Sequence, residues 1–265
     1  MGKWFEAIGE AHAEWMREQR LFFVATAAAR TCVNVSPKGH AQETFAVLGE
    51  KQVAYLDMTG SGNETFAHSQ VDGRITVMFV AFTGPPKIMR LHGRCRCILK
   101  PDVPAELKAR FSERFVNHKG FRAVVVVDVD RVSSSCGYSI PYYDFVKDRE
   151  TLFDTFEKKS EEEMEDYHVL KNSYSIDRLP GLGHRRFGSG RWGVQMRLTD
   201  GSGKPTPHAK DGFWWGYKDQ TALEALQEWV FAGARVWELL TLRDLGMIGV
   251  GAAAAWAVMS RRPHS

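Results

Sequence analysis

Cysteine is scarce in this chain of 265 residues, which contains only Cys32, Cys95, Cys97 and Cys136. No two of them form a CxxC pair, and their density is far below that of a disulfide-stabilised secreted domain. Four cysteines allow two bridges, but in a reducing compartment they remain thiols, and we expect reduced, buried thiols here. Cys95 and Cys97 have no histidine or acidic neighbour at the spacing of a zinc site, so we predict no metal centre.

A large excess of charge of one sign is also missing. Lysine and arginine number 35 against 32 aspartate and glutamate, which leaves a net charge of +3. Proteins that bind DNA or RNA usually carry a strongly basic stripe, so this balance predicts no nucleic-acid partner. One stretch, residues 185–197, has four arginines among glycines. We expect these arginines to fold back on acidic helices rather than to bind RNA.

Long hydrophobic runs are nearly absent. Glu6, Glu10 and Glu14 interrupt the N-terminal segment, so no secretory signal is predicted, and we expect a cytoplasmic protein. The exception is the uncharged run 245–259, which would span about 22 Å as a helix. Because the hydrocarbon core of a bilayer is about 30 Å thick, we favour a buried or partner-packed terminal helix. The alternative is a tail anchor on an intracellular membrane, with membrane contact through 245–259.

Alternating apolar residues dominate the first half of the chain, whose overall composition (44% hydrophobic, 25% charged) is that of a globular protein. An amphipathic helix is expected over 3–19, and after it the period changes from helical to strand-like. The expected strands are 21–27, 32–36, 44–49, 52–57, 74–82, 87–99 and 121–132. In 87–99 Met89 and Leu91 share one face while Arg90 and His92 share the other, over a length typical of a bent barrel strand.

The close succession of these strands favours antiparallel pairing and a closed barrel, so the predicted fold class is mainly β with helices (α+β). Short helices are expected within 60–71 and over 104–115, where Pro104 stands at the start. Beyond residue 132 the chain is mostly helical or irregular, with an acidic helix pair within 142–171 and a long amphipathic helix over 223–240. The predicted domains are a barrel over 1–135, a helical extension over 136–182, and a C-terminal extension over 183–265.

An ordered series of motifs resembles a known family. FFVATA (22–27), NVSPKG (34–39), AYLDMTGSGNET (54–65) and GRITVMFVAFTGPPKIMRLHGR (73–94) are similar to the pyridoxamine 5'-phosphate oxidase-like, FMN-binding split-barrel proteins. SSCGYSIPYYDFV (134–146) and SIDRLPGL (175–182) resemble a fungal-type branch. The resemblance covers residues 1–182. It implies a split barrel that forms a homodimer and holds flavin mononucleotide (FMN) in clefts between the subunits.

The resemblance also implies which residues hold the cofactor. A flavin phosphate needs fixed cations, hydroxyls and backbone N–H groups. Lys38 stands at a strand end where the family keeps a phosphate-facing lysine, and Ser61 precedes a short helix where the family binds phosphate. The backbone around Tyr55 would line the flavin ring. The full predicted set is Ser36, Lys38, Tyr55, Leu56, Asp57, Gly60, Ser61, Thr65, Arg74 and Arg90.

Several of these positions have simpler explanations. Ser61 and Glu64 fit a capping box that would only start a helix, and Lys38 fits an ordinary exposed turn. The family's arginine five residues before the lysine is Val33 here, and its Arg-Lys pair is replaced by Thr65-Phe66. Glu64 beside that place would repel a phosphate by about 1 kcal/mol at about 4 Å. We therefore do not expect oxidation of pyridoxamine phosphate.

Two functions remain open at this stage. The first is an FMN-dependent oxidoreductase on a homodimeric split barrel, with an unknown small-molecule substrate and unknown catalytic residues. The flavin ring would do the redox chemistry while the protein positions it. The alternative is a non-catalytic split-barrel protein that binds a phosphorylated or flat ligand, such as a vitamin B6 phosphate or haem, and that is membrane-tethered if 245–259 is an anchor.

Overall fold

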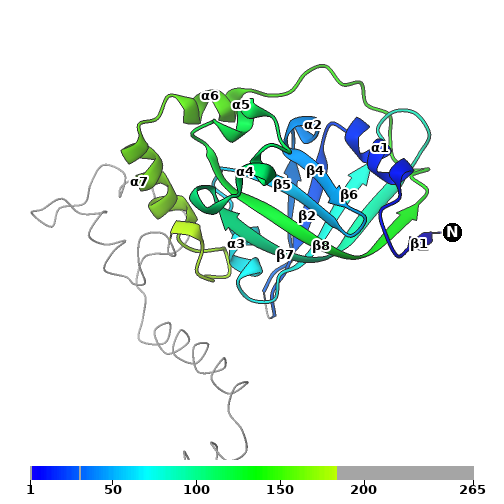
Figure 1. Cartoon of the computed structure of the whole chain (residues 1–265), viewed down its shortest axis with the longest axis horizontal. Helices are drawn as coiled ribbons and strands as arrows, with labels where there is room; N and C mark the ends of the chain where they lie inside the picture. The colour runs from blue at the N-terminus through cyan, green and yellow to red at the C-terminus, as the bar shows by residue number, and fades with distance from the viewer. Residues whose placement is uncertain (1, 30, 184–265) are drawn as a thin grey trace, which may run out of the picture. The chain divides into compact units, whose positions relative to one another are not determined.

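One antiparallel sheet of eight strands curls around a hydrophobic interior in the computed structural model, which describes residues 2–29 and 31–183 (Figure 1). The strand order is β3-β2-β6-β7-β8-β5-β4, and β1 pairs with β8 outside this path. The predicted class, mainly β with helices, is confirmed. The strands are β1 (Lys3–Phe5), β2 (Phe22–Thr26), β3 (Asn34–Lys38), β4 (Phe45–Gly49), β5 (Gln52–Met58), β6 (Arg74–Val80), β7 (Ile88–Leu99) and β8 (Phe121–Ser135).

The expectations for residues 184–265 lie outside the described residues. They are the arginine-rich stretch, the helix over 223–240 and the apolar run 245–259. None of the helices between residues 2 and 183 that the structure describes is long and apolar enough to cross a membrane.

The two long strands β7 and β8 form the middle of the sheet. Met89, Leu91 and Cys95 of β7 are buried in the interior, as the alternation predicted. The register between β7 and β8 shifts between His92 and Gly93, which marks a β-bulge. A Cβ atom on Gly93 would lie 2.0 Å from the carbonyl oxygen of Asp128, so only glycine fits this close approach.

Two hydrophobic clusters hold the sheet from either side. The interior cluster includes Phe22, Tyr55 and Phe79, and it packs under α1. The outer cluster includes Leu56 and Val124, and it is covered by aromatic residues near α4 and α5. Strands β5 and β8 are therefore buried on both faces, which explains their nearly continuous apolar sequences.

The helix predicted over 3–19 is wrong at its start. Residues Lys3–Phe5 form β1 and pair with β8, and only Glu10–Glu18 form a helix, with Gly9 as its N-cap. The helix predicted over 104–115 is two short helices, because the Ser112 N–H donates to the Glu43 carbonyl and interrupts it. The helices and the single 3₁₀ turn are α1 (Glu10–Glu18), α2 (Ala41–Thr44), α3 (Glu64–Ser69), η1 (Lys100–Asp102), α4 (Ala105–Lys108), α5 (Glu113–Val116), α6 (Thr151–Glu157) and α7 (Glu161–Asn172).

The acidic helix pair is present as α6 and α7, whereas residues 142–150 have no regular structure. Helix α7 begins at a capping box, in which Ser160 accepts from the Glu163 N–H and the Glu163 carboxylate accepts from the Ser160 N–H. In Figure 1, α7 and β1 lie on opposite sides of the sheet, and the segment between β8 and α6 crosses from one to the other. This segment helps to form a cavity at one end of the barrel.

Candidate functional site

A buried carboxylate with two cations lies at the end of β5. Asp57 Oδ2 is 2.8 Å from Arg122 Nε, and Asp57 Oδ1 is 3.3 Å from Lys38 Nζ. Burial by itself would raise the pKa of Asp57, but Arg122 and Lys38 outweigh burial and keep that pKa below its usual value. Asp57 is therefore ionised at neutral pH, and this trio carries one net positive charge.

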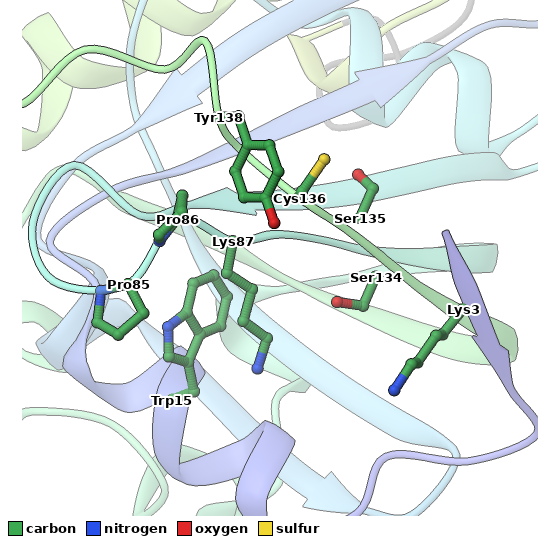
Figure 2. Close-up of a pocket in the computed structure, with 9 residues that line it drawn as sticks. All are labelled: Lys3, Trp15, Pro85, Pro86, Lys87, Ser134, Ser135, Cys136 and Tyr138. Atoms are coloured by element: carbon green, nitrogen blue, oxygen red, sulfur yellow. The ribbon is translucent and has the colours of Figure 1, made fainter. Parts of the chain in front are cut away.

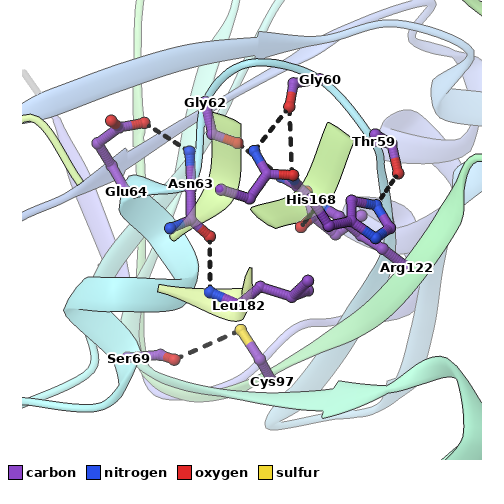
Figure 3. A network of polar contacts seen from close by, with 12 residues as sticks. Thr59, Gly60, Gly62, Asn63, Glu64, Ser69, Cys97, Arg122, His168 and Leu182 are labelled. Carbon is purple, nitrogen blue, oxygen red and sulfur yellow. Dashed lines mark hydrogen bonds and ion pairs between the residues drawn. The ribbon is translucent and has the colours of Figure 1, made fainter. Parts of the chain in front are cut away.

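Arg122 also holds the loop that was expected to bind a phosphate. Its Nη2 donates to the Gly62 carbonyl at 2.8 Å, and its Nη1 donates to Asn172 Oδ1 at 3.0 Å. Asn172, at the end of α7, donates in turn to the Gly60 carbonyl at 2.9 Å. Figure 3 shows this network, with Arg122 and the Gly60 and Gly62 carbonyls directed toward one another. The NVSPKG and TGSG motifs are thus joined through Lys38, Asp57 and Arg122.

The same loop is fixed from its other side by the extension. Thr59 Oγ1 lies 2.9 Å from His168 Nε2, and Asn63 Oδ1 accepts from the Leu182 N–H at 3.2 Å (Figure 3). The Gly60, Ser61 and Gly62 carbonyls of this loop thus have hydrogen-bond donors within the chain, whereas Asn63 Nδ2 is buried without a partner among the described residues.

A carboxylate occupies the start of α3. Glu64 Oε2 accepts from the Asn63 N–H at 2.9 Å, and Asn63 rather than Ser61 is the N-cap. The capping box predicted for Ser61 and Glu64 is therefore wrong. Because N–H and C=O point to opposite sides of a trans peptide, the N–H groups after Gly60 and Gly62 face away from Arg122. On that side the Asn63 N–H meets the Glu64 carboxylate, and a phosphate there would have to displace it.

A cavity of about 560 Å³ lies beside the trio. Its floor is formed by the turn before α2 and by the end of β5, through Pro37, Gly39, Met58 and Thr59. Its walls carry four phenylalanines, namely Phe115, Phe145, Phe153 and Phe156. Cavities of this size and apolar lining are typical of small-molecule sites, which usually measure about 300–1,000 Å³.

The rim of this cavity is basic. Lys147 and Arg149 are exposed on the segment before α6, and neither has an ion-pair partner in the part of the chain that the structure describes. Arg20 lies 4.6 Å above the Phe145 ring. Asp148 is the one carboxylate among the described lining residues, so the rim favours an anionic ligand.

His118 attaches the wall of the cavity to the barrel. Its Nδ1 accepts from the Gly120 N–H at 2.9 Å, and its Nε2 lies 3.0 Å from the Phe153 carbonyl. Its ring stacks on Phe153 at 3.8 Å between centroids. Burial lowers the pKa of His118, and the Phe153 carbonyl and Glu157 offset only part of that effect. His118 is therefore neutral at physiological pH, with its proton on Nε2.

Four of the ten predicted cofactor residues belong to this network. Lys38, Asp57, Gly60 and Ser61 belong to the network, because the Ser61 carbonyl lies 3.4 Å from Asn172 Nδ2. Tyr55 is fully buried, with Thr65 beside its hydroxyl, so neither side chain faces solvent. Burial, followed by the charge of Asp57, raises the pKa of Tyr55 well above its usual value.

The structure places the other predicted residues elsewhere. Arg74 bonds Asp72 at 2.9 Å and lies at the opposite end of β2 from Lys38, about 13 Å along the strand. Arg90 lies three strand spacings from Pro37, about 14 Å, and donates to Ser135. Leu56 points into the outer hydrophobic cluster, and Ser36 accepts from Asn34 on β3. Arg74 and Arg90 do not join the Lys38 group.

Sequence reasoning missed three residues of the network: Arg122, His168 and Asn172. Arg122 had a readable signal, because a charge inside the apolar run FRAVVVV must be buried and therefore paired. His168 and Asn172 had none, because the acidic sequence of α7 indicated only a solvated helix.

Comparison with known proteins covers most of the described chain. Residues 8–136 match the pyridoxamine 5'-phosphate oxidase family profile. The pyridoxamine 5'-phosphate oxidase family protein ustO of Aspergillus flavus is 37% identical over 194 residues, which cover 67% of this chain and 77% of the relative. Among solved structures, HupZ of Group A Streptococcus is 20% identical with a TM-score of 0.37, over 47% of this chain and 91% of that protein. An FMN-binding protein from Syntrophomonas wolfei is 12% identical with a TM-score of 0.37, over 45% of this chain and 81% of that protein.

Proposed function

The chain belongs to the pyridoxamine 5'-phosphate oxidase family, and from this premise we propose that it is an FMN-dependent oxidoreductase with its cofactor in the 560 Å³ cavity. The observation that carries this proposal is the composition of that cavity. Four phenylalanines suit a flat aromatic ring, and Lys147 and Arg149, which have no ion-pair partner among the described residues, suit a phosphate.

The residues present fit a flavin, although not with the family's own phosphate anchors. The Glu64 carboxylate at the start of α3 would repel a phosphate there, and Lys38 already forms an ion pair with Asp57. We therefore assign the phosphate to the basic rim and the ring to the phenylalanine walls. When bound, the isoalloxazine ring would supply two-electron redox chemistry. The phenylalanine walls and the basic rim would bind and orient it.

Direct titration with FMN tests the proposal. We expect micromolar binding that quenches flavin fluorescence, and weaker binding of riboflavin, which lacks the phosphate. The double variant Lys147→Ala/Arg149→Ala should lose at least about tenfold in FMN affinity, since each charge-assisted hydrogen bond contributes about 1.5–3 kcal/mol. Arg74→Ala is the control, because Arg74 lies far from the cavity and should bind FMN as the parent does. Absence of FMN binding at micromolar concentrations, or equal binding by the double variant, would contradict the proposal.

A non-catalytic binding protein is the second candidate, and Glu64 is the observation that favours it. With a carboxylate at the start of α3 and Val33 in place of an arginine, the barrel lacks anchors on which an enzyme of this family depends. Thermal-shift measurements with pyridoxal phosphate, haem and FMN distinguish the two functions. Stabilisation by haem or pyridoxal phosphate alone supports this second function, whereas stabilisation by FMN alone supports the first.

We also propose that the barrel forms a homodimer. Val35 in the edge strand β3 is 59% exposed, and Val33 just before that strand is 71% exposed, so two apolar side chains lie open at this edge. Light scattering of the purified chain should give twice the monomer mass. A Val35→Lys variant should shift toward the monomer if this edge lies in the interface.

A further inference from the structure

A second pocket shares no lining residue with the cavity described above. It has a volume of about 500 Å³ and is formed where β1, β8 and the turn before β7 meet (Figure 2). The strand register explains its composition. Lys3 pairs with Ser134, and Ile88, which follows Lys87, pairs with Ser135. β8 therefore places the Ser134 hydroxyl between two lysines, whereas Ser135 follows on the opposite face of the strand and accepts from Arg90 at 3.4 Å.

Lys87 is held in place by its backbone and by Trp15. Lys87 follows Pro85 and Pro86, whose rings restrict the backbone, and its carbonyl accepts from the Ala81 N–H at 2.9 Å. Lys87 Nζ lies 4.5 Å from the centroid of the Trp15 ring, in the arrangement of a cation–π contact. In Figure 2 the Lys3 and Lys87 side chains extend from either side of Ser134, with Tyr138 above them.

The charge of this pocket is unbalanced. No carboxylate is among the described residues that line it, and Lys3 has no ion-pair partner in residues 2–29 and 31–183. Burial lowers the pKa of Lys87, and Glu18 offsets only part of that effect. An anion between the two ammonium groups would restore the electrostatic stabilisation that burial removes from Lys87.

We propose that this pocket binds a small aromatic acid. Its carboxylate would lie between Lys3 and Lys87 and accept from the Ser134 hydroxyl. Its ring would contact Tyr138 and the two prolines, which form the apolar side of the pocket in Figure 2. A carboxylate on a ring is preferred over a bare inorganic anion because the lining combines two lysines with four residues that carry rings, namely Trp15, Pro85, Pro86 and Tyr138. This inference does not depend on flavin binding.

Benzoate is a suitable probe, and nuclear magnetic resonance can locate it. We expect millimolar binding, about −4 kcal/mol, with shifts of the Trp15 indole N–H. The pKa of His12 gives a second readout, because Lys87 contributes, after burial, to its depression. A bound carboxylate should raise the His12 pKa toward its ordinary value. Acetate should bind more weakly than benzoate, and benzylamine, which carries the opposite charge, should not bind.

Three variants separate the contributions of charge and of ring contact to benzoate binding. Lys87→Gln should weaken benzoate about tenfold or more, which corresponds to about 1.4 kcal/mol. Tyr138→Ala should weaken benzoate but not acetate, because it removes only ring contact. Lys51→Gln is the matched control, since Lys51 is an exposed lysine in the β4–β5 turn. No shift at Trp15 and His12 up to about 10 mM benzoate, or equal binding by Lys87→Gln, would overturn the proposal. Binding lost instead in Lys147→Ala would place benzoate in the other cavity and would also overturn it.

Discussion

At the scale of single residues, burial determines how strongly a charged side chain depends on its ion-pair partner. Asp57 and Arg122 are both almost fully buried, at 3% and 5% exposure of their side chains, so each depends on the other for its charge. Ion pairs at the surface, such as Arg96 with Asp128, have water as an alternative partner. The two kinds of pair should therefore respond very differently to substitution.

Arg122→Met should destabilise the chain by about 3–5 kcal/mol, because it leaves Asp57 buried with only Lys38 as its partner. The matched control Arg96→Met breaks an exposed pair and should cost less than about 1 kcal/mol. Urea unfolding of both variants measures the difference. Similar losses in the two variants would show that the Arg122 pair is not a structural anchor.

Stability should decline when the pH falls from about 7.5 to about 5.5. Burial lowers the pKa values of His12, His92 and His118, so the unfolded chain takes up these protons before the folded chain does. The stabilisation is complete above the unfolded pKa of about 6.5 and is lost as the pH falls through the folded values. Urea midpoints at the two pH values should fall less in His118→Gln than in the parent. If the urea midpoint of His118→Gln depends on pH as strongly as that of the parent, groups other than His118 cause the loss of stability.

The four thiols should differ in reactivity. Burial raises the pKa of Cys95 strongly and that of Cys97 to about 12, so both should stay unmodified in the native protein. Cys136 and Cys32 are exposed, but a hydrogen bond to Asp177 raises the pKa of Cys32. Labelling with a thiol reagent should modify Cys136 first and Cys32 more slowly. Asp177→Asn should accelerate Cys32 alone, and rapid labelling of all four cysteines would contradict this order.

At the scale of elements, contacts between distant segments shape the site. The bulge lies in β8, where Asp130 is the extra residue, and β7 approaches that strand closely beside it at Gly93. Helix α7 brings Asn172 and His168 to the loop 59–63, and the turn after it places Asp177 against the Cys32 N–H at 3.2 Å. The extension therefore completes one end of the barrel.

Gly93→Ala should destabilise the chain severely, by more than about 2 kcal/mol, because its Cβ would lie 2.0 Å from the Asp128 carbonyl and force β7 and β8 apart. Gly49→Ala is the control, since a Cβ there meets no atom within 4 Å and should change stability by less than about 1 kcal/mol. Thermal unfolding of both variants compares them. If Gly93→Ala is as stable as the parent, the bulge, and with it the close approach of β7 to β8, is absent.

At the scale of the whole molecule, both hydrophobic clusters are complete before residue 154. The interior cluster runs from Ile8 to Val132, and the outer cluster ends with Phe153 packed against it. The polar network extends further, to Leu182. The barrel and the extension thus have different roles, one supplying burial and the other fixing the loop beside the cavity.

A chain ended after Gly183 should unfold cooperatively and keep the FMN affinity of the full chain. A chain ended after Ser135 should be less stable, because Arg122 loses Asn172 and the cavity loses its Phe145 and Phe153 walls. Calorimetry and FMN titration of both truncated chains test this. Equal affinity in the shorter chain would place the cofactor outside the cavity.

The sequence alone predicted the parts that depend on local pattern. The period-two alternation in 87–99, the antiparallel pairing of successive strands such as β2 with β3 and β4 with β5, and the short helix after TGSG all appear in the structure. The burial expected of the thiols holds for Cys95 but is wrong for Cys32 and Cys136, which are exposed. These features follow from which face a residue occupies along its own strand, and that information is contained in neighbouring residues.

Tertiary structure decided which segments meet. Asp57 and Arg122 are 65 positions apart, and Thr59 and His168 are 109 apart, so no local pattern could pair them. No local pattern could pair Lys3 with Ser134 either, because residues 3–5 form a strand where the sequence predicted the start of a helix. Periodicity fixes the face of a strand but not its neighbour, and the neighbour is chosen by register and burial over the whole chain. The charges of both pockets were therefore visible in the sequence, while their grouping was not.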